Sequence, residues 1–326
     1  MAPTNLLFTS GPATMATGPV VVSQSMLVIG VFYWLPAVLA YAATSIRDQK
    51  RRAAVLLSVM ASIVLTRVVP WRPWPAFRSS PSLWEHYMRY WNVRVVGNAA
   101  SLYNSNGPFV FGVSPHGIVP YSLGLMAYGR LSSVFNTPRI VIASVVKWIP
   151  LFAQVLQWGG AVEAVDRAMS TALAAGESIA VTPGGIAEMF VAGTNDSGEQ
   201  AVLASRKGFI RVAISHGATL VPVYVFGANH LFSRISLPDA VSSFSRRIRA
   251  SLMLFYGRFG LPVPFARPLT YAIGRAILLQ KPTVAGAHVN EDEVDFVHNA
   301  FVRSLLQAFQ DSKGTAGYPL ATLDII

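Results

Sequence analysis

Two long apolar segments open the chain. Val20–Ile46 is a nearly uninterrupted apolar run, and a membrane-spanning helix needs about 20 such residues. A second run, Ala53–Thr66, has only 14 residues, which is short for a span. Pro36 could instead break the first run into a re-entrant wedge. The pattern therefore predicts one membrane helix, or a hairpin, ahead of a globular region.

From Pro108 onward, short β-type runs alternate with helical segments and end at turns rich in glycine and proline. Gly176 and Gly217 follow two of the helical segments, where a C-cap is expected. Such alternation indicates an α/β domain with a largely parallel sheet and flanking helices. The expected strands are Phe109–Val113, Ile140–Ser144, Ser178–Thr182 and Thr219–Val225, and the expected helices are Glu163–Ala175 and Gly208–His216.

Three later segments complete the pattern. Val241–Phe255 has an apolar stripe at helical spacing, which suits either a helix at the membrane interface or one facing the core. The acidic run Glu291–Asp295 suits the first turn of a last helix, because negative charge is favoured at a helix N-terminus. The tail from Asp311 onward is expected to be irregular.

Composition strengthens the membrane interpretation. Hydrophobic residues make up 52% of the chain and charged residues 13%, against about 25% charged in an ordinary soluble domain. The net charge of +11 favours lipid headgroups or phosphorylated substrates, since no nucleic-acid-binding motif accompanies it. The chain has no cysteine, which excludes disulfides and a cysteine nucleophile, and no zinc-ligand spacing. The basic cluster Arg47–Arg52 is expected to stay in the cytosol.

A histidine follows the first expected strand of the α/β region. His116 stands between Pro115, which fixes the backbone, and Gly117, which permits a tight bend. A histidine held in this way can take the proton from an alcohol and make it a nucleophile. A structural role is the commoner one for a single histidine in a turn.

A serine hydrolase is the sharpest alternative at this position. Gly112–His116 resembles a nucleophile elbow, but His116 replaces the second glycine of that motif. Pro115 also removes the backbone N–H that would complete an oxyanion hole. Ser114 is therefore a poor candidate for the nucleophile.

Several motifs in order resemble those of the type-2 diacylglycerol acyltransferase family, which includes mono- and diacylglycerol and wax-alcohol acyltransferases. The segment FVFGVSPHG resembles the family's strand and His-Pro-His-Gly signature, and RKGFIRVAISHGATLVPVYVFGANHLF resembles its longest motif. The similarity extends from about Trp84 to the C-terminus. Further matching segments are WIPLFAQVLQWGGAVEAVDR, TPGGIAEMF, YGRFGLPVPFARPLTYAIG and KPTVAGAHVNEDEVDFVHNAFVRSLLQAF.

The resemblance implies a glycerolipid-acyltransferase-like α/β fold and a membrane enzyme of the endoplasmic reticulum, with a cytosolic catalytic domain and potential lipid-droplet association. We expect a membrane-anchoring region at residues 1–75 and a catalytic domain at residues 76–326. The expected reaction is acyl transfer from acyl-CoA to diacylglycerol, giving triacylglycerol. Monoacylglycerol and long-chain alcohols are alternative acceptors, and a lipid hydrolase or a non-catalytic lipid-binding protein are alternatives from other classes.

Within that family pattern, His116 is expected to be the catalytic base. The first histidine of the signature is Ser114 here, and Tyr121 stands where the wider superfamily has an aspartate. The carboxylate that orients His116 must then come from elsewhere, and Glu188 is the first candidate. We expect the adjacent turn at Gly184 and Gly185 to supply donors for the oxyanion.

Acyl-CoA carries phosphates that need cations. Arg206 and Lys207 precede a helix that begins at Gly208, whose free N–H groups favour an anion. Arg167 and Arg258 lie in other segments that resemble the family motifs, although a single basic residue is more often a solvated charge. No metal or bound cofactor is expected. The residues expected to line the site are Phe226, Gly227, Asn229 and His230.

Overall fold

The structure is a computed structural model that describes residues 5–15, 17–68, 72–98, 100–103, 107–191, 198–235, 254–280 and 289–326. Within these ranges, eight strands form one sheet: β1 (Leu6–Thr9), β2 (Arg94–Gly97), β3 (Phe109–Ser114), β4 (Arg139–Ile142), β5 (Val162–Glu163), β6 (Ile179–Val181), β8 (Thr219–Phe226) and β11 (Thr270–Ile273).

The strand order is β1-β2-β11-β8-β3-β6-β4-β5. From β8 to β5 every neighbouring pair is parallel, whereas β1 with β2 and β11 with β8 are antiparallel. The predicted α/β architecture is confirmed. Every residue of the central strands β3 and β8 is buried, as in strands that helices cover on both faces.

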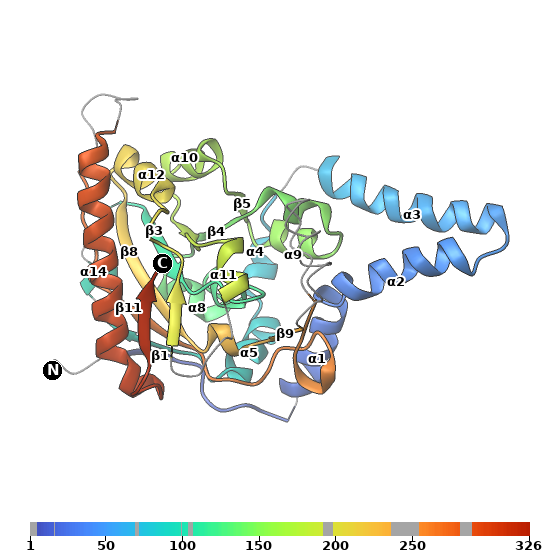
Figure 1. Ribbon diagram of the computed structural model, residues 1–326, viewed down its shortest axis with the longest axis horizontal. Coiled ribbons are helices and arrows are strands. Elements are labelled where there is room, and N and C mark those ends of the chain that lie inside the picture. The colour runs from blue at the N-terminus through green and yellow to red at the C-terminus, as the bar shows by residue number, and fades with distance from the viewer. Residues whose placement is uncertain are drawn as a thin grey trace.

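Two helical layers cover the sheet (Figure 1). One layer contains α10 (Asp166–Ala174), α12 (Gly208–His216) and α14 (Glu291–Ala316), whose buried side chains share a core cluster with Val110 of β3. The other contains α1 (Thr17–Val28), α5 (Pro81–Tyr90), α7 (Tyr121–Leu125) and α8 (Gly129–Val134), which share a cluster with Phe111. Successive residues of β3 thus reach opposite faces.

Some predicted boundaries were wrong. Glu163 ends β5 and the helix α10 begins only at Asp166, while Ser144 begins the 3-10 helix η1 (Ser144–Trp148) instead of ending a strand. The helix predicted over Gly208–His216 is confirmed as α12, with Gly217 at a φ of +59° as its C-cap. The remaining short helices are α4 (Pro75–Ser79), α6 (Ala100–Tyr103), α9 (Phe152–Trp158), α11 (Ile186–Val191), η2 (Ala228–His230) and η3 (Arg258–Gly260).

The C-terminal tail is more ordered than expected. The helix α14 starts after Asn290, whose side chain accepts a hydrogen bond from the backbone N–H of Asp292, and it continues to Ala316. The strand β12 (Thr322–Ile325) then pairs in parallel with β7 (Gly198–Ala201). The prediction of an irregular tail from Asp311 was wrong, because β12 gains a strand partner from a distant part of the chain.

A second small sheet pairs β9 (Ser233–Ile235) with β10 (Leu254–Tyr256) in antiparallel register. Most of the segment predicted as a helix with an apolar stripe, Val241–Phe255, lies outside the described residues. Phe255, its last residue, is buried in β10 and packs against Tyr33 and Phe232.

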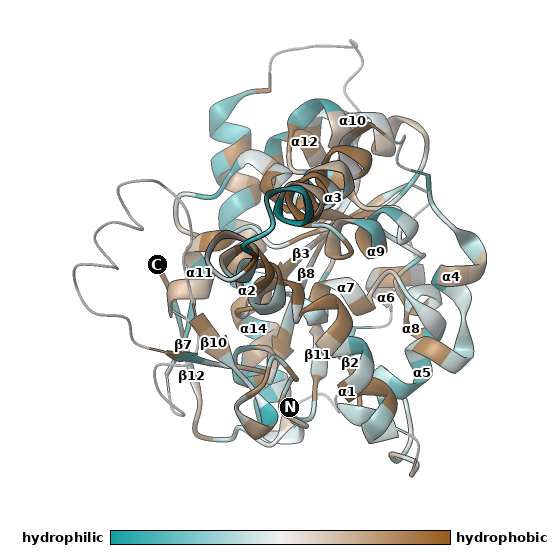
Figure 2. Ribbon diagram, turned by 90° about the vertical axis from the view of Figure 1, so that its right-hand side faces the viewer, coloured by the Kyte–Doolittle hydropathy of each residue, from teal (hydrophilic) through white to brown (hydrophobic). Residues whose placement is uncertain are grey.

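The N-terminal apolar run divides into α1 and α2 (Val31–Thr44), and α3 (Gln49–Val68) follows. In Figure 1, α2 and α3 form a hairpin that projects from the body, and Figure 2 shows mainly hydrophobic residues along α2. Among the described helices, none alone has the length and apolarity to cross a bilayer. The pair α1 and α2, bent by 47°, meets that criterion together.

The division at residue 75 stays a prediction, but β1 and α1 already belong to the body. The strand β1 pairs with β2, and Val21 of α1 is fully buried in the core. Of the described elements before residue 75, α2 and α3 project from the body (Figure 1), and Phe32 and Tyr33 at the start of α2 still pack against Phe255. We refer to α2 and α3 together as the hairpin.

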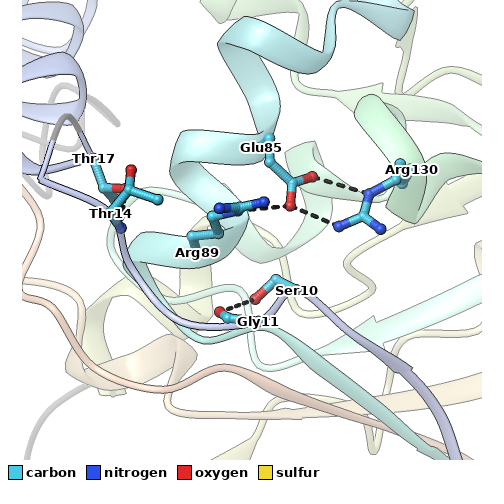
Figure 3. A network of polar contacts seen from close by, with 7 residues as sticks. All are labelled: Ser10, Gly11, Thr14, Thr17, Glu85, Arg89 and Arg130. Carbon is cyan, nitrogen blue, oxygen red and sulfur yellow. Dashed lines mark hydrogen bonds and ion pairs between the residues drawn. The ribbon is translucent and has the colours of Figure 1, made fainter.

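Two ion pairs stabilise the helical layer that contains α5 and α8 (Figure 3). Glu85 of α5 contacts Arg89 at 3.0 Å and Arg130 of α8 at 2.6 Å. Burial alone would raise the pKa of Glu85, but its bonds to the two guanidinium groups lower the pKa on balance. The pair thus ties α5 to α8, next to the chain that leads from β1 into α1.

Candidate active site

The expected catalytic histidine lies at the carboxyl end of β3, where ligands bind in open α/β sheets. Gly117 adopts a φ of +67°, and a Cβ there would stand 2.7 Å from the carbonyl oxygen of Ala228. Only glycine fits this position, for its backbone conformation and for its close approach to η2. The turn that carries His116 is therefore packed directly against the turn that follows β8.

The His116 ring is held in one tautomer by its own turn. Nδ1 lies 2.7 Å from the Gly117 carbonyl oxygen. A carbonyl can only accept, so Nδ1 carries the hydrogen and Nε2 keeps its lone pair. Burial lowers the pKa of His116, partly offset by the bond to Gly117. The ring is thus neutral near pH 7, with Nε2 free to take a proton.

Glu188, on α11, is 1% exposed and lies against this turn, but it does not hold the imidazole. Its Oε2 accepts a hydrogen bond from the backbone N–H of His116 at 2.7 Å, and Oε1 accepts one from Val202 N–H at 3.0 Å. The expectation that Glu188 orients the ring was wrong in this respect. The Gly117 carbonyl orients the ring, and Glu188 fixes the backbone that carries it.

The Glu188 carboxyl titrates close to neutrality. Burial raises its pKa to about 7, although the two backbone N–H donors and the nearby charge of Arg206 lower it. A Cβ on Gly184 would stand 2.3 Å from the Glu188 carboxyl carbon, so the glycine turn makes room for this side chain. The N–H of Gly185 donates to the Thr182 carbonyl within the turn, which leaves it engaged instead of open to an oxyanion.

The four expected basic residues have different surroundings. Arg206 is exposed and close enough to Glu188 to affect its pKa, whereas Lys207 pairs with Asp295 of α14 at 2.5 Å. Arg167 is exposed on α10, and Arg258 lies over the Phe259 ring at 5.0 Å. Gly208 begins α12 as expected. Arg206 is thus the basic residue that the structure places beside the carboxylate.

The residues expected to line the site divide into two groups. Phe226 is buried between Phe309 and Tyr318, so it is a core residue. Gly227 has a φ of +88° and turns the chain from β8 into η2. Asn229 and His230 both face one carboxylate, Glu199 of β7: Asn229 Nδ2 donates to its Oε2, and His230 Nε2 lies 3.4 Å from its Oε1.

Glu199 was missed from the sequence. It is 7% exposed, yet it lies in a short polar segment between two loops, where nothing in the residue pattern marks it as buried. Its neighbours are Tyr224 of β8 and Asn229 and His230 of η2, far away in the chain, so only the fold reveals the cluster. Ser114 is fully buried, and its hydroxyl has no hydrogen-bond partner among the described residues.

Within the described part of the chain, no group of three or more histidine, aspartate or glutamate side chains could hold a metal ion. The expectation that no metal is needed stays a prediction. A neutral imidazole held through Nδ1 can perform general-base chemistry on a hydroxyl group through Nε2.

The residues of this site lie within a segment that matches a known protein family. Residues 73–324 match the family model described as diacylglycerol acyltransferase, so the chain belongs to that family. This confirms the resemblance drawn from the sequence motifs. The matched residues include His116, Glu188 and Glu199, and they exclude the hairpin.

Relatives named for two different acceptors are equally similar to this chain. Diacylglycerol O-acyltransferase 2 from Homo sapiens is 27% identical over 265 residues, which cover 73% of this chain and 64% of that protein. The 2-acylglycerol O-acyltransferase 3 from Homo sapiens is 27% identical over 264 residues, covering 74% of each chain. The chain thus spans just under two thirds of the length of the first relative.

Among solved structures, the 1-acyl-sn-glycerophosphate acyltransferase PlsC from Thermotoga maritima is 15% identical. The match covers 87% of this chain and 97% of that chain, with a TM-score of 0.39. A TM-score below 0.5 does not establish a shared fold. The identification therefore depends on the family match.

Proposed function

We propose that the protein is an acyl-CoA-dependent O-acyltransferase that esterifies the free hydroxyl of an acylglycerol, with diacylglycerol as the preferred acceptor and triacylglycerol and CoA as products. The observation that carries this proposal is the contact between His116 Nδ1 and the Gly117 carbonyl, which places the hydrogen on Nδ1 and the lone pair on Nε2. Membership of the diacylglycerol acyltransferase family supports the reaction class.

In the proposed reaction, Nε2 takes the hydroxyl proton as the acceptor oxygen attacks the thioester carbonyl of acyl-CoA. The resulting tetrahedral intermediate collapses when the carbon–sulfur bond breaks. The imidazolium then returns the proton to the departing CoA sulfur, so His116 ends the cycle neutral. Glu188 holds the His116 backbone in place throughout, and no covalent acyl-enzyme is formed.

We also propose that Arg206 and Lys207 bind the phosphates of acyl-CoA. Arg206 is exposed beside the carboxylate that supports His116, and both residues precede the N-terminus of α12. Lys207 would have to exchange its bond to Asp295 for a phosphate. The proposed contribution of Arg167 and Arg258 is weaker, because neither lies in a described contact with the catalytic turn.

The proposed location is the endoplasmic reticulum membrane, with the catalytic body in the cytosol and lipid-droplet association as a further location. Exposed apolar residues of the hairpin support membrane attachment, among them Leu57 at 68% exposure. Protease treatment of sealed microsomes tests the orientation. Protection of the C-terminus would contradict a cytosolic catalytic body.

The acceptor is tested with labelled acyl-CoA and membranes that contain the protein. Diacylglycerol, monoacylglycerol and a long-chain alcohol are offered separately, and one sample has no acceptor. The highest kcat/KM is expected with diacylglycerol. A higher value with monoacylglycerol would change the acceptor, in keeping with the equal identity to 2-acylglycerol O-acyltransferase 3. Acceptor-independent release of free fatty acid would instead indicate a hydrolase.

A further inference from the structure

A histidine and a carboxylate, His230 and Glu199, lie next to the turn that carries His116. Glu199 of β7 is 7% exposed, and each of its two oxygens faces a consecutive residue of η2. Oε2 accepts the Asn229 side-chain amide, and Oε1 lies 3.4 Å from His230 Nε2. Burying a carboxylate is unfavourable unless polar partners compensate it, and Asn229 and His230 are those partners for Glu199.

The pair connects two parts of the structure that hold the His116 turn, η2 and Glu188. On one side, η2 is in close contact with the catalytic turn, since the Ala228 carbonyl leaves room only for glycine at position 117. On the other side, β7 leads within three residues to Val202, whose N–H holds Glu188. Glu199 therefore links η2, which packs against Gly117, to the segment whose Val202 N–H holds Glu188. Glu188 in turn holds the backbone N–H of His116.

One buried tyrosine is within electrostatic reach of both carboxylates. The hydroxyl of buried Tyr224 lies near both: burial raises its pKa well above the ordinary value, and the charges of Glu199 and Glu188 raise it further. Tyr224 also lies opposite Ser114 in the register of β8 and β3. The cluster therefore lies next to the strand end that precedes His116.

The C-terminal segment supports this cluster from outside. The Tyr318 ring stacks on His230, with centroids 6.0 Å apart and an angle of 11° between the planes. The backbone of Ile326 accepts hydrogen bonds from Leu203 and Ala204, which directly follow Val202. The strand β12 holds β7 by parallel pairing. Both ends of the connection from β7 to η2 are therefore fixed.

We infer that Glu199, together with Asn229 and His230, is a positioning group that keeps the His116 turn in its reactive geometry. The inference rests on the proposed function, because it assigns these residues to the acyl transfer that His116 would catalyse. None of the three touches the reacting atoms. Their effect passes through Gly117, which orients the imidazole, and through Glu188, which fixes the backbone beneath it.

The test compares variants at positions 199 and 230 in the full-length protein in membranes. Glu199→Met keeps the length of the side chain but removes both acceptors, whereas Glu199→Gln keeps one. We expect kcat to fall about tenfold or more in Glu199→Met, since small displacements of a catalytic group are costly, with KM for acyl-CoA unchanged. Glu199→Gln should recover much of the rate. Rates are normalised to folded protein, measured by thermal unfolding.

His230 provides the matched comparison. His230→Gln retains a side-chain donor for Glu199 and should stay close to the wild type, while His230→Leu should lower kcat. In the Glu199→Met background, His230→Leu should cost nothing more, because the shared contact is already lost. The control is His216→Leu at the end of α12, where the ring contacts only the Val212 carbonyl among the contacts found for it.

The decisive readout is the dependence on His116. If the group acts through His116, Glu199→Met should not lower the residual rate of His116→Ala any further. An inactive His116→Ala together with a normal kcat in Glu199→Met, or equal further losses in every background, would overturn the positioning assignment and leave the proposed function intact. A fully active His116→Ala would overturn both.

Discussion

The surroundings of His116 and the hairpin are built in opposite ways. Glu188 beside His116 is 1% exposed, and both of its oxygens accept backbone N–H groups. In the hairpin, Leu57 is 68% and Leu65 60% exposed. The first region is fixed by contacts within the chain, whereas the second offers apolar side chains to its environment. We therefore expect chemistry and membrane attachment to belong to separate parts, each of which can be disabled without the other.

The extent of the family match follows the same division. It begins at residue 73, after α3, and contains every residue that we place around His116. Phe32 and Tyr33 at the start of α2 pack against Phe255, and the rest of the hairpin projects from the body, so we expect its sequence to be constrained mainly by apolarity and helix formation. Variants in the two regions should consequently differ in kind, with lost turnover in one and lost membrane association in the other.

The largest effect is expected at His116, the proposed catalytic base. His116→Ala should lower kcat by about 10²–10⁴-fold, because attack by an alcohol needs proton removal as the bond forms. Membrane association should stay unchanged. The measurement is triacylglycerol synthesis per amount of protein in matched membranes.

Ser114→Ala is the matched control for this variant. The Ser114 hydroxyl is buried without a hydrogen-bond partner among the described residues, so its removal should keep most activity and should not destabilise the fold. Near-normal synthesis in His116→Ala, or an acyl adduct that only Ser114→Ala abolishes, would restore the serine-nucleophile hypothesis.

A smaller but still large effect is expected from Glu188→Gln. The amide provides one acceptor where the carboxylate provides two, so either His116 N–H or Val202 N–H loses its partner. We expect kcat to fall about tenfold or more through displacement of the turn. An unchanged kcat in the folded variant would remove Glu188 from the support of His116.

The same variant also has a pH signature. The pKa of Glu188 is about 7 in the fold, against an ordinary value of 4.5, so the folded protein binds more protons between these values. The stability of the wild type should therefore fall, relative to Glu188→Gln, as pH rises from 4.5 to 7. The total is about 3 kcal/mol, at about 1.4 kcal/mol per pKa unit. Denaturant unfolding of both proteins across this range measures the difference.

The sequence predicted the parts of this molecule that depend on local pattern. Buried runs such as Thr219–Val225 and the capped segment Gly208–His216 are recognisable without partners, because apolar continuity and a C-cap glycine are local signals. His116 was recognisable for the same reason, since it stands between Pro115 and Gly117.

Features that depend on partners distant in the chain were missed. The strand β12 looks irregular in sequence because it exists only through its pairing with β7. Glu199 looks like a surface residue until η2 is placed against it. Glu188 was recognised, but its contact with the His116 backbone, and not with the ring, follows from the geometry of the glycine turn.

A moderate effect on substrate binding is expected from Arg206→Gln. Loss of a charged hydrogen bond to phosphate should raise KM for acyl-CoA about tenfold and leave KM for the acceptor unchanged. Lys207→Gln should have a smaller effect, because Lys207 is already paired with Asp295. The control is Arg303→Gln, at an exposed position of α14. An unchanged KM for acyl-CoA in the double variant at positions 206 and 207 would remove this assignment.

The smallest effect on chemistry is expected in the hairpin. In Leu57→Gln/Leu65→Gln, two exposed apolar side chains become polar, and each buried leucine would contribute about 1.5–3 kcal/mol to lipid attachment. The fraction of protein that floats with liposomes should fall, while kcat in detergent micelles stays at the wild-type value, because neither residue contacts the His116 turn. Leu320→Gln is the control, since Leu320 is 87% exposed but lies on the body. Unchanged flotation of the hairpin variant would mean that the attachment resides elsewhere. A loss of kcat in micelles would show that the hairpin also supports catalysis, which would break the division between the two regions.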